Sequence, residues 1–269
     1  MDKILLVASI TFKDLIRNKA LHGIYFASIF LFLANIAITA LFSWELGKVA
    51  VDVGLSIVSL AGLLFIFFLA TGSVAGEITE KTVYFVLARP VTRTQYVLGK
   101  YLGLAGVLFL SCVVIGVSAA LSVRMAIAQY PLYQPVNYSW GTFFLAWLFL
   151  LLSLLVTLSF SLFWTMVSSH AYTAMLFSIL TYCIGSGLET TRYLLLRDAN
   201  FADKTVLRWL ISAMVWVFPN LKAFDLKTTA AYGLEVTPWY LVITAAYGIL
   251  YIFMMLFLAA QVMNRRELG

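Results

Sequence analysis

The stretch GEITEKTVYFVLARPVTRTQYVLGK, residues 76–100, determines how the rest of the chain is organised. It is a charged interruption between two long apolar runs, 53–75 and 101–123. Glu77 and Glu80 are one helical turn apart. We expect them near the start of a helix, where carboxylates complement the macrodipole, and Pro90 then breaks that helix. We interpret the stretch as a docking feature at the membrane surface; a solvated loop whose arginines only set topology is the alternative.

The rest of the chain is apolar enough to exclude a soluble globular domain. Hydrophobic residues make up 63% of the sequence and charged residues 11%, and the mean hydropathy is +0.97. A helix needs about 20 apolar residues to cross a bilayer, and continuous runs of that length favour helices over the alternating strands of a barrel. The sequence predicts an all-α integral membrane protein, a single domain over 1–269 with six transmembrane helices at 20–42, 53–75, 101–123, 143–167, 171–188 and 239–262.

Basic residues give the expected orientation. They concentrate in residues 1–19, in the stretch 76–100 and at the C-terminal end, whereas the two short loops on the other side hold only Lys48 and Arg124. The positive-inside rule therefore predicts that both termini are cytoplasmic. Anionic lipid on that side accounts for the net charge of +6, so the charge requires no nucleic acid partner.

Residues 1–19 have the pattern of an amphipathic helix that lies in the membrane interface. Apolar residues recur at helical spacing, at Ile4, Ala8, Phe12 and Leu15. Lys13, Asp14 and Arg17 fall on another face. A frayed basic tail is the alternative, but it does not require such periodicity.

A few polar or small residues stand out within the expected spans. Asn35 lies near the middle of the first span, and Ser153, Thr157 and Ser161 form a stripe on the fourth. Such groups either contact a neighbouring helix or line a pathway, and helix contact is the default. The glycine pairs Gly72/Gly76 and Gly99/Gly103 flank the loop, so we expect them to hold its two ends together.

The segment 189–238 is too mixed in composition to be one further span. Its apolar part, 209–218, is too short to cross and is predicted to form a short re-entrant or interfacial helix. Trp209 and Trp216 are seven residues apart, which would place both on one side of a helix as interfacial anchors. The segment is interpreted as a gate, as a seal, or as a platform for an external protein. The platform's polar contacts would be Arg192, Arg197, Asp198 and Asp203.

The sequence lacks the residues that several classes of function require. No expected span has a charged residue near its centre, which argues against ion-coupled transport and voltage sensing. Gly99-Lys100 superficially matches a phosphate-binding loop, but Thr94 and Tyr101 break the pattern on both sides. The two histidines are far apart, and Cys112 and Cys183 lie in apolar runs as packing residues. We expect no catalytic residue, no metal site and no cofactor bound by this chain.

Two motifs resemble those of ABC-2 type transporter permeases. Glu77, Thr82, Leu87-x-x-Pro90-Val91-x-Arg93 and the following Gly99-Lys100 resemble the family's cytoplasmic loop. Phe12-Lys13-Asp14-Leu15 with Arg17-Asn18-Lys19 resembles its N-terminal interfacial helix. Lys81 stands where the family usually has Gly, and Asp14 where it usually has Glu.

The resemblance implies a non-catalytic permease of the bacterial inner membrane. Two such chains, identical or different, would assemble with two cytoplasmic ATPase subunits that bind the ATP and Mg. The absence of charged residues from the spans favours export of an apolar or amphipathic substrate. The alternative is a subunit that transmits ATPase-driven motion to an extracytoplasmic partner protein. The resemblance also implies a coupling helix at 78–88 and an ATPase contact formed by Glu77, Glu80, Thr82, Leu87, Arg89, Pro90 and Arg93.

Overall fold

The computed structural model contains helices joined by turns and short connections, and no strand, in the part of the chain that it describes, which comprises residues 2–41, 46–80, 82, 91–129, 138–168, 170–197, 214 and 217–265. Within those residues, five helical stretches are long and apolar enough to cross a membrane: Gly47–Thr79, Arg93–Met125, Trp140–Val167, Ala171–Thr191 and Pro238–Arg265. Each contains one of the predicted spans. In α2 (Lys19–Leu41), the part whose side chains the structure describes, Lys19–Leu33, is apolar but shorter than a span.

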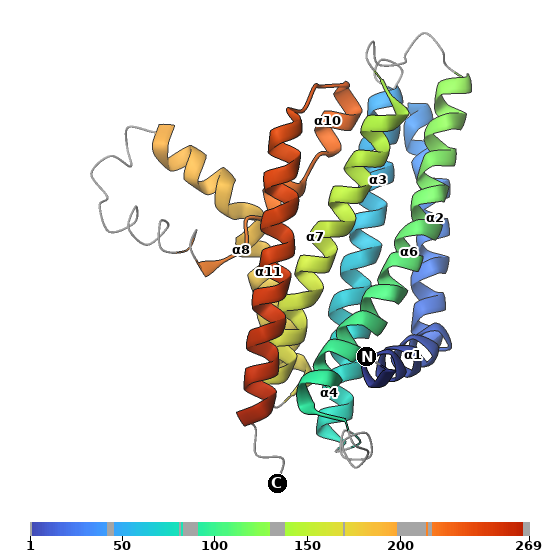
Figure 1. The fold of residues 1–269 in the computed structure, drawn as a ribbon. Coiled ribbons are helices and arrows are strands. Elements are labelled where there is room, and N and C mark those ends of the chain that lie inside the picture. The colour runs from blue at the N-terminus through green and yellow to red at the C-terminus, as the bar shows by residue number, and fades with distance from the viewer. Residues whose placement is uncertain are drawn as a thin grey trace.

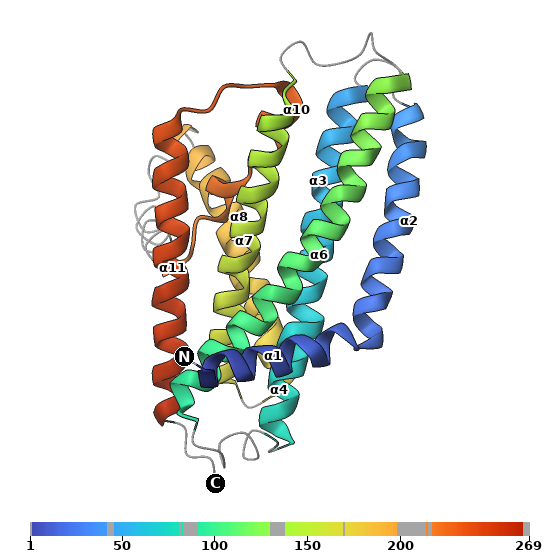
Figure 2. The ribbon, with the colours of Figure 1, turned by 45° about the vertical axis from the view of Figure 1, so that its right-hand side comes forward.

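The long helices run side by side as a bundle (Figures 1 and 2). They are α2, α6 (Arg93–Gln129), α7 (Trp140–Val167), α11 (Pro238–Arg265), and the continuous path of α3 (Leu46–Leu64), π-helical η1 (Phe65–Ala70) and α4 (Thr71–Thr79). The core lies between α3, α6 and α7, where Leu55, Leu108 and Leu158 are at most 1% exposed. Large apolar residues such as Phe30 and Phe253 are exposed on the outer faces, as expected of surfaces that contact lipid.

The π-helical turn lies at the buried centre of the bundle. The Thr71 hydroxyl donates to the carbonyl oxygen of Ile66, five residues earlier, at 3.0 Å. It also lies 2.6 Å from the hydroxyl of Ser161 on α7. The Ile66 carbonyl oxygen therefore accepts from both the backbone amide and the hydroxyl of Thr71, and the same side chain joins two spans.

Helix α1 (Asp2–Ile16) lies across one end of the bundle, and Figure 2 shows it nearly at right angles to the long helices. Val7, Thr11 and Leu15 are buried. A Cβ at Gly103 would lie 2.7 Å from the Ala8 carbonyl oxygen, and one at Gly99 only 2.6 Å from Val7 Cβ. Both termini lie at this end (Figure 1), which we call the termini-bearing end.

The glycine pairs do not hold the loop ends together, so that prediction is wrong. Gly99 and Gly103 contact α1, whereas a Cβ at Gly72 or Gly76 would meet nothing within 4 Å. Spacing alone shows that a helix can be approached closely, but it does not identify which neighbour approaches.

After α8 (Ala171–Arg197) the chain returns into the bundle before it enters α11. Figure 1 shows the far part of α8 leaning away from the other helices. The short helices η4 (Leu221–Phe224) and α10 (Lys227–Tyr232) follow, and α10 packs against α3 and α7. Helix α10 ends at Gly233 with a φ of 63°, a left-handed conformation that glycine adopts without strain.

Candidate functional site

A buried ion pair joins two spans at the termini-bearing end. Lys100, on α6, donates from its Nζ to Oε1 of Glu77, in the last turn of α4. The Tyr96 hydroxyl donates to the other carboxylate oxygen at 2.8 Å. The Lys100 side chain is 5% exposed and that of Glu77 26%. We call these three residues the Glu77 cluster.

The position of Glu77 corrects the sequence-based prediction. Glu77 and Glu80 lie at the C-terminal end of α4, because the second span continues to Thr79 and no new helix starts there. A carboxylate at a helix C-terminus opposes the macrodipole. Lys100 and Tyr96 offset that cost, and being four residues apart on α6 they reach Glu77 from the same face.

The end of α4 is closed by backbone and side-chain hydrogen bonds. The Glu80 amide donates to the Gly76 carbonyl oxygen at 2.8 Å, and the Thr82 hydroxyl donates to that of Glu77 at 3.2 Å. Leu87, Arg89 and Pro90, with most of the expected coupling helix 78–88, lie outside the described residues. Their assignment to an ATPase contact remains a prediction.

Arg93 binds within the chain. Its guanidinium donates from Nη1 to the carbonyl oxygens of Met263 and Asn264, at 3.0 and 2.9 Å. A cation at the C-terminal end of α11 is favoured by the macrodipole and satisfies two carbonyls that lack helical partners. Arg93 therefore ties the first residue of α6 to the last turn of α11.

A capping motif that the sequence prediction missed fixes the start of α6. The Thr92 amide donates to Oε1 of Gln95 at 3.0 Å, and the Gln95 amide donates to the Thr92 hydroxyl at 3.2 Å. This is the reciprocal bonding of a capping box. The third span therefore begins two turns earlier than the predicted residue 101, and Gly99-Lys100 lies inside the helix. The Thr-x-x-Gln spacing was the available signal.

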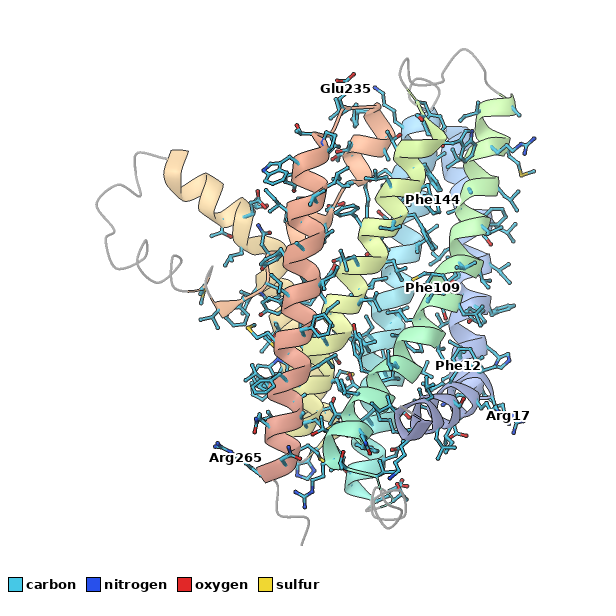
Figure 3. All side chains as sticks on the ribbon, viewed as in Figure 1. Phe12, Arg17, Phe109, Phe144, Glu235 and Arg265 are labelled. Carbon is cyan, nitrogen blue, oxygen red and sulfur yellow. The ribbon has the colours of Figure 1, made fainter. Side chains whose placement is uncertain are left out.

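The residues singled out on α1 divide between two environments. Phe12 is half-buried, and a Cβ at Gly106 would lie 3.2 Å from its ring. Lys13, Asp14 and Arg17 are exposed. In Figure 3, Phe12 lies beside α6 whereas Arg17 points away from the bundle. Contact of the exposed residues with an ATPase stays a prediction.

The hydroxyl stripe on α7 is buried in the bundle. Ser161 meets Thr71 as described above, and the Thr157 hydroxyl donates to the Ser153 carbonyl oxygen at 2.8 Å. Ser153 also lines a pocket of about 140 Å³ with Ser59, Tyr182 and Ser186. Asn35 lies on α2, but its side chain is outside the described residues.

The chain between α8 and α11 enters the bundle deeply. The Tyr251 hydroxyl donates to the Val217 carbonyl oxygen at 3.2 Å, and the Asn220 amide donates to the Tyr247 hydroxyl at 2.9 Å. Tyr247 and Tyr251 are 9 and 13 residues from the start of α11 at Pro238, so these bonds lie about 14 and 20 Å along that helix. Gly185 permits the approach, since a Cβ there would lie 2.5 Å from the Pro219 carbonyl oxygen.

Most residues expected to act in that segment cannot be placed. Helix α8 contains Arg192 and Arg197, but their side chains are outside the described residues, as are Asp198, Asp203, Trp209 and Trp216 entirely. The described part, 217–226, carries other polar groups that sequence reasoning did not single out. Asn220 donates from its side chain to Oε2 of Glu189 at 3.0 Å.

Charged residues from this segment line the polar pocket. Lys222 donates to Oδ2 of Asp225 at 2.9 Å, and both line the pocket with Lys227. Burial by itself would raise the pKa of the Asp225 carboxyl, but the hydrogen bond from Lys222 and the charge of Lys227 outweigh it. The net result is a pKa below its ordinary value. Asp225 is therefore ionised at neutral pH, and the pocket has a charged wall.

Comparison with known proteins identifies the family. No curated protein matches the chain. The family model described as ABC-2 family transporter protein matches residues 4–202, which is well over half of the sequence. The match runs from α1 into the segment after α8, and it includes every residue of the Glu77 cluster. It confirms the resemblance drawn from the two motifs: the chain belongs to the ABC-2 family of transporter proteins.

Proposed function

We propose that the protein is the permease subunit of an ATP-driven exporter of apolar or amphipathic substrates. Two copies, or this chain and a related one, assemble with two cytoplasmic ATPase subunits that bind the ATP and Mg. In this proposal the whole chain, 1–269, is one transmembrane domain of a bacterial inner membrane, with six crossings and both termini cytoplasmic. Family membership supports the proposal, and the termini-bearing end supplies the mechanical basis.

The observation that carries the mechanism is the set of ties around residues 81–92. Glu77 and Lys100 join α4 to α6 on the two sides of this loop. Arg93 joins the start of α6 to the end of α11, and α1 packs on α6. Because rigid elements transmit displacement better than flexible tethers, a push on the loop moves three spans together.

The side of the bundle away from the termini-bearing end has the closed arrangement expected of an exporter between transport cycles. Segment 217–226 enters the bundle between α8 and α11, held by Tyr247, Tyr251 and Asn220. The polar pocket beside it, at about 140 Å³, is smaller than the roughly 300–1,000 Å³ that drug-sized ligands occupy. We infer that the segment closes the path and that the power stroke opens it.

Force transmission to an external protein is the second candidate. The far part of α8 leans away from the bundle in Figure 1, which would present it to a partner outside the membrane. In that case the spans would move without a path opening between them. Export ranks first because segment 217–226 places charged groups, Lys222 and Asp225 among them, at a polar pocket inside the bundle.

The test uses the chain co-purified with an ABC ATPase and reconstituted in vesicles. A lipophilic fluorescent dye and a short-chain fluorescent phospholipid serve as transport probes. We expect no ATP hydrolysis by the chain alone, hydrolysis by the complex, and ATP-dependent loss of one probe. Arg93→Glu should abolish transport while hydrolysis continues, because it repels the α11 carbonyls that Arg93 now binds. Arg265→Glu, on the exposed end of α11, is the matched control.

Hydrolysis by the isolated chain would contradict the permease assignment. Hydrolysis by the complex with neither probe moved, together with crosslinks from α8 to an external protein, would favour force transmission. Normal transport by Arg93→Glu would show that the ties at the termini-bearing end do not carry the motion.

A further inference from the structure

An apolar groove runs between α6 and α7 on the outer surface of the bundle. Its volume is about 640 Å³, and its lining contains only apolar and aromatic residues or glycine. Val117, Phe109 and Phe144 are 56%, 51% and 60% exposed, so the groove opens sideways, away from the core. Figure 3 shows Phe109 and Phe144 in the space between the two helices. We call it the α6–α7 groove.

A glycine and a tryptophan form the floor of the groove. A Cβ at Gly116 would lie 2.4 Å from Nε1 of Trp147, so the ring can lie against α6 only where that residue is glycine. The indole N–H donates to the Cys112 carbonyl oxygen at 3.1 Å. Its one polar atom is therefore satisfied, and the ring faces remain as apolar surface. Phe144 stacks on Trp147, with ring centroids 5.7 Å apart.

The length of the groove matches one leaflet of a bilayer. Eleven residues separate Phe109 from Ala120 on α6 and Trp140 from Leu151 on α7. Each helix therefore lines the groove for about 16 Å, and half of a hydrocarbon core is about 15 Å. The groove lies in the halves of α6 and α7 farther from the termini-bearing end, where Trp140 marks the boundary expected of an interfacial tryptophan.

The width of the groove discriminates between occupants. Spread over that length, 640 Å³ corresponds to a mean cross-section of about 40 Å², or roughly 7 Å across, whereas a helix with its side chains is about 10–12 Å wide. A helix from another protein or from a second copy is wider than this. An extended hydrocarbon chain fits.

A cation lies where the headgroup of such a chain would be. Val113, Val117, Ala120 and Arg124 follow one another at helical spacing on the same face of α6. Arg124 lines a second pocket, of about 340 Å³, with Ile127, Ala128 and Trp140, and Trp140 lines both pockets. Arg124 is exposed and has no hydrogen-bond or ion-pair partner among the residues that the structure describes.

We propose that the α6–α7 groove binds one acyl chain of a bilayer phospholipid whose anionic headgroup pairs with Arg124. The groove supplies the hydrophobic surface, and the single charge at its end selects anionic over zwitterionic lipid. The site is in the leaflet farther from the termini. It does not depend on ATPase coupling, so its failure and that of the permease proposal are separable.

The test uses the purified protein in nanodiscs that contain phosphatidylglycerol or phosphatidylcholine with a photoactivatable group at mid-chain. We expect adducts on residues 109–120 and 140–151, several times more abundant with phosphatidylglycerol. Ala120→Phe, which fills the groove, should reduce them at least fivefold. Ala27→Phe, the same enlargement at an exposed position of α2, should not. If Ala120→Phe does not fold, Val117→Phe replaces it, because that position is exposed enough to tolerate a larger ring.

Substitutions of Arg124 distinguish the effect of its charge on lipid preference from the effect of the shape of the groove. Arg124→Gln should bring the ratio of phosphatidylglycerol to phosphatidylcholine adducts close to one, and Arg124→Lys should keep most of the preference. Adducts spread equally over α2 and α11, and insensitive to filling the groove, would overturn the proposal. So would a disulfide between two copies through Phe144→Cys that abolishes labelling, because a second copy would then occupy the groove.

Discussion

The carboxylate of Glu77 lies where the dipole of its own helix disfavours it, yet it accepts two hydrogen bonds from α6. Lys100 is nearly inaccessible, with 5% of its side chain exposed, and Glu77 retains 26%. An ammonium that is out of water depends on its partner more than a half-buried carboxylate does. The pair is therefore asymmetric: losing Glu77 strands a buried charge, and losing Lys100 leaves a charge that water can reach.

The first prediction follows from this asymmetry. Glu77→Gln should lower the free energy of unfolding by about 3–5 kcal/mol, and Lys100→Met by less, because only the first leaves a buried charge unpaired. The double substitution should recover much of the loss. Thermal unfolding in detergent measures all three variants, in a Cys183→Ser background because Cys183 is exposed, with a thiol-reactive dye that labels buried Cys112 on unfolding. Equal losses that add in the double variant would show that the two groups do not act as a pair.

At the scale of elements, α1 is held by a close fit to α6. Its buried residues meet a surface of α6 that Gly99, Gly103 and Gly106 keep free of side chains. The Ala8 carbonyl oxygen and the Thr11 side chain lie within 3 Å of where a Cβ on Gly103 would be. Backbone atoms cannot move aside as the end of a flexible side chain can, so a larger residue must displace the whole helix.

The second prediction concerns that displacement. Gly103→Val should lift α1 from the bundle and raise the maleimide labelling rate of a Val7→Cys reporter at least tenfold. The background carries Cys183→Ser, since Cys183 is exposed. Gly76→Val is the matched control: it places the same branched residue in a helix where a Cβ would meet nothing within 4 Å. Equal labelling in both variants would mean that helix propensity, and not docking, controls α1.

The sequence predicts elements well where one periodicity decides them. The spans at 143–167 and 239–262 lie within α7 and α11, because an unbroken apolar run of this length forms a helix when it crosses a membrane. The ends of α4 and α6 were misplaced because polar residues continue these helices beyond their apolar runs. The capping box at Thr92 and Gln95 was readable, and a search for it would have placed the start of α6.

Other features depend on contacts between distant residues. Glu77 and Lys100 are 23 residues apart, and no local pattern indicates that they pair. The partners of Arg93, Met263 and Asn264, lie at the far end of the chain, and the expected ATPase contact of Arg93 stays a prediction. The depth of 217–226 is set by Gly185 and Tyr251, which belong to two other helices. The composition of that segment marked it as unusual but did not indicate how deeply it enters the bundle.

At the scale of the whole molecule, the expected number of crossings depends on where the first and last helices lie. Figure 1 shows α1 and the C-terminal end of α11 at the same end of the bundle, an arrangement that an even number of crossings would give. Five helical stretches among the described residues have the length and composition of a span, and we propose that α2 supplies a sixth crossing. Helix α2 has 23 residues, a length of about 35 Å, which exceeds a hydrocarbon core of about 30 Å.

The last prediction is therefore a six-crossing topology with α2 as the first span. Single cysteines at Lys13 and Arg265 should react with an impermeant maleimide from the cytoplasmic side of sealed vesicles. Cysteines at Lys48 and Ser139 should react only from the other side. The Lys13–Lys48 pair is decisive, because α2 alone separates these residues. If both reacted from one side, α2 would lie on the surface, the remaining five crossings would place the termini on opposite sides, and the shared attachment of α1, α4, α6 and α11 to one cytoplasmic ATPase would fail.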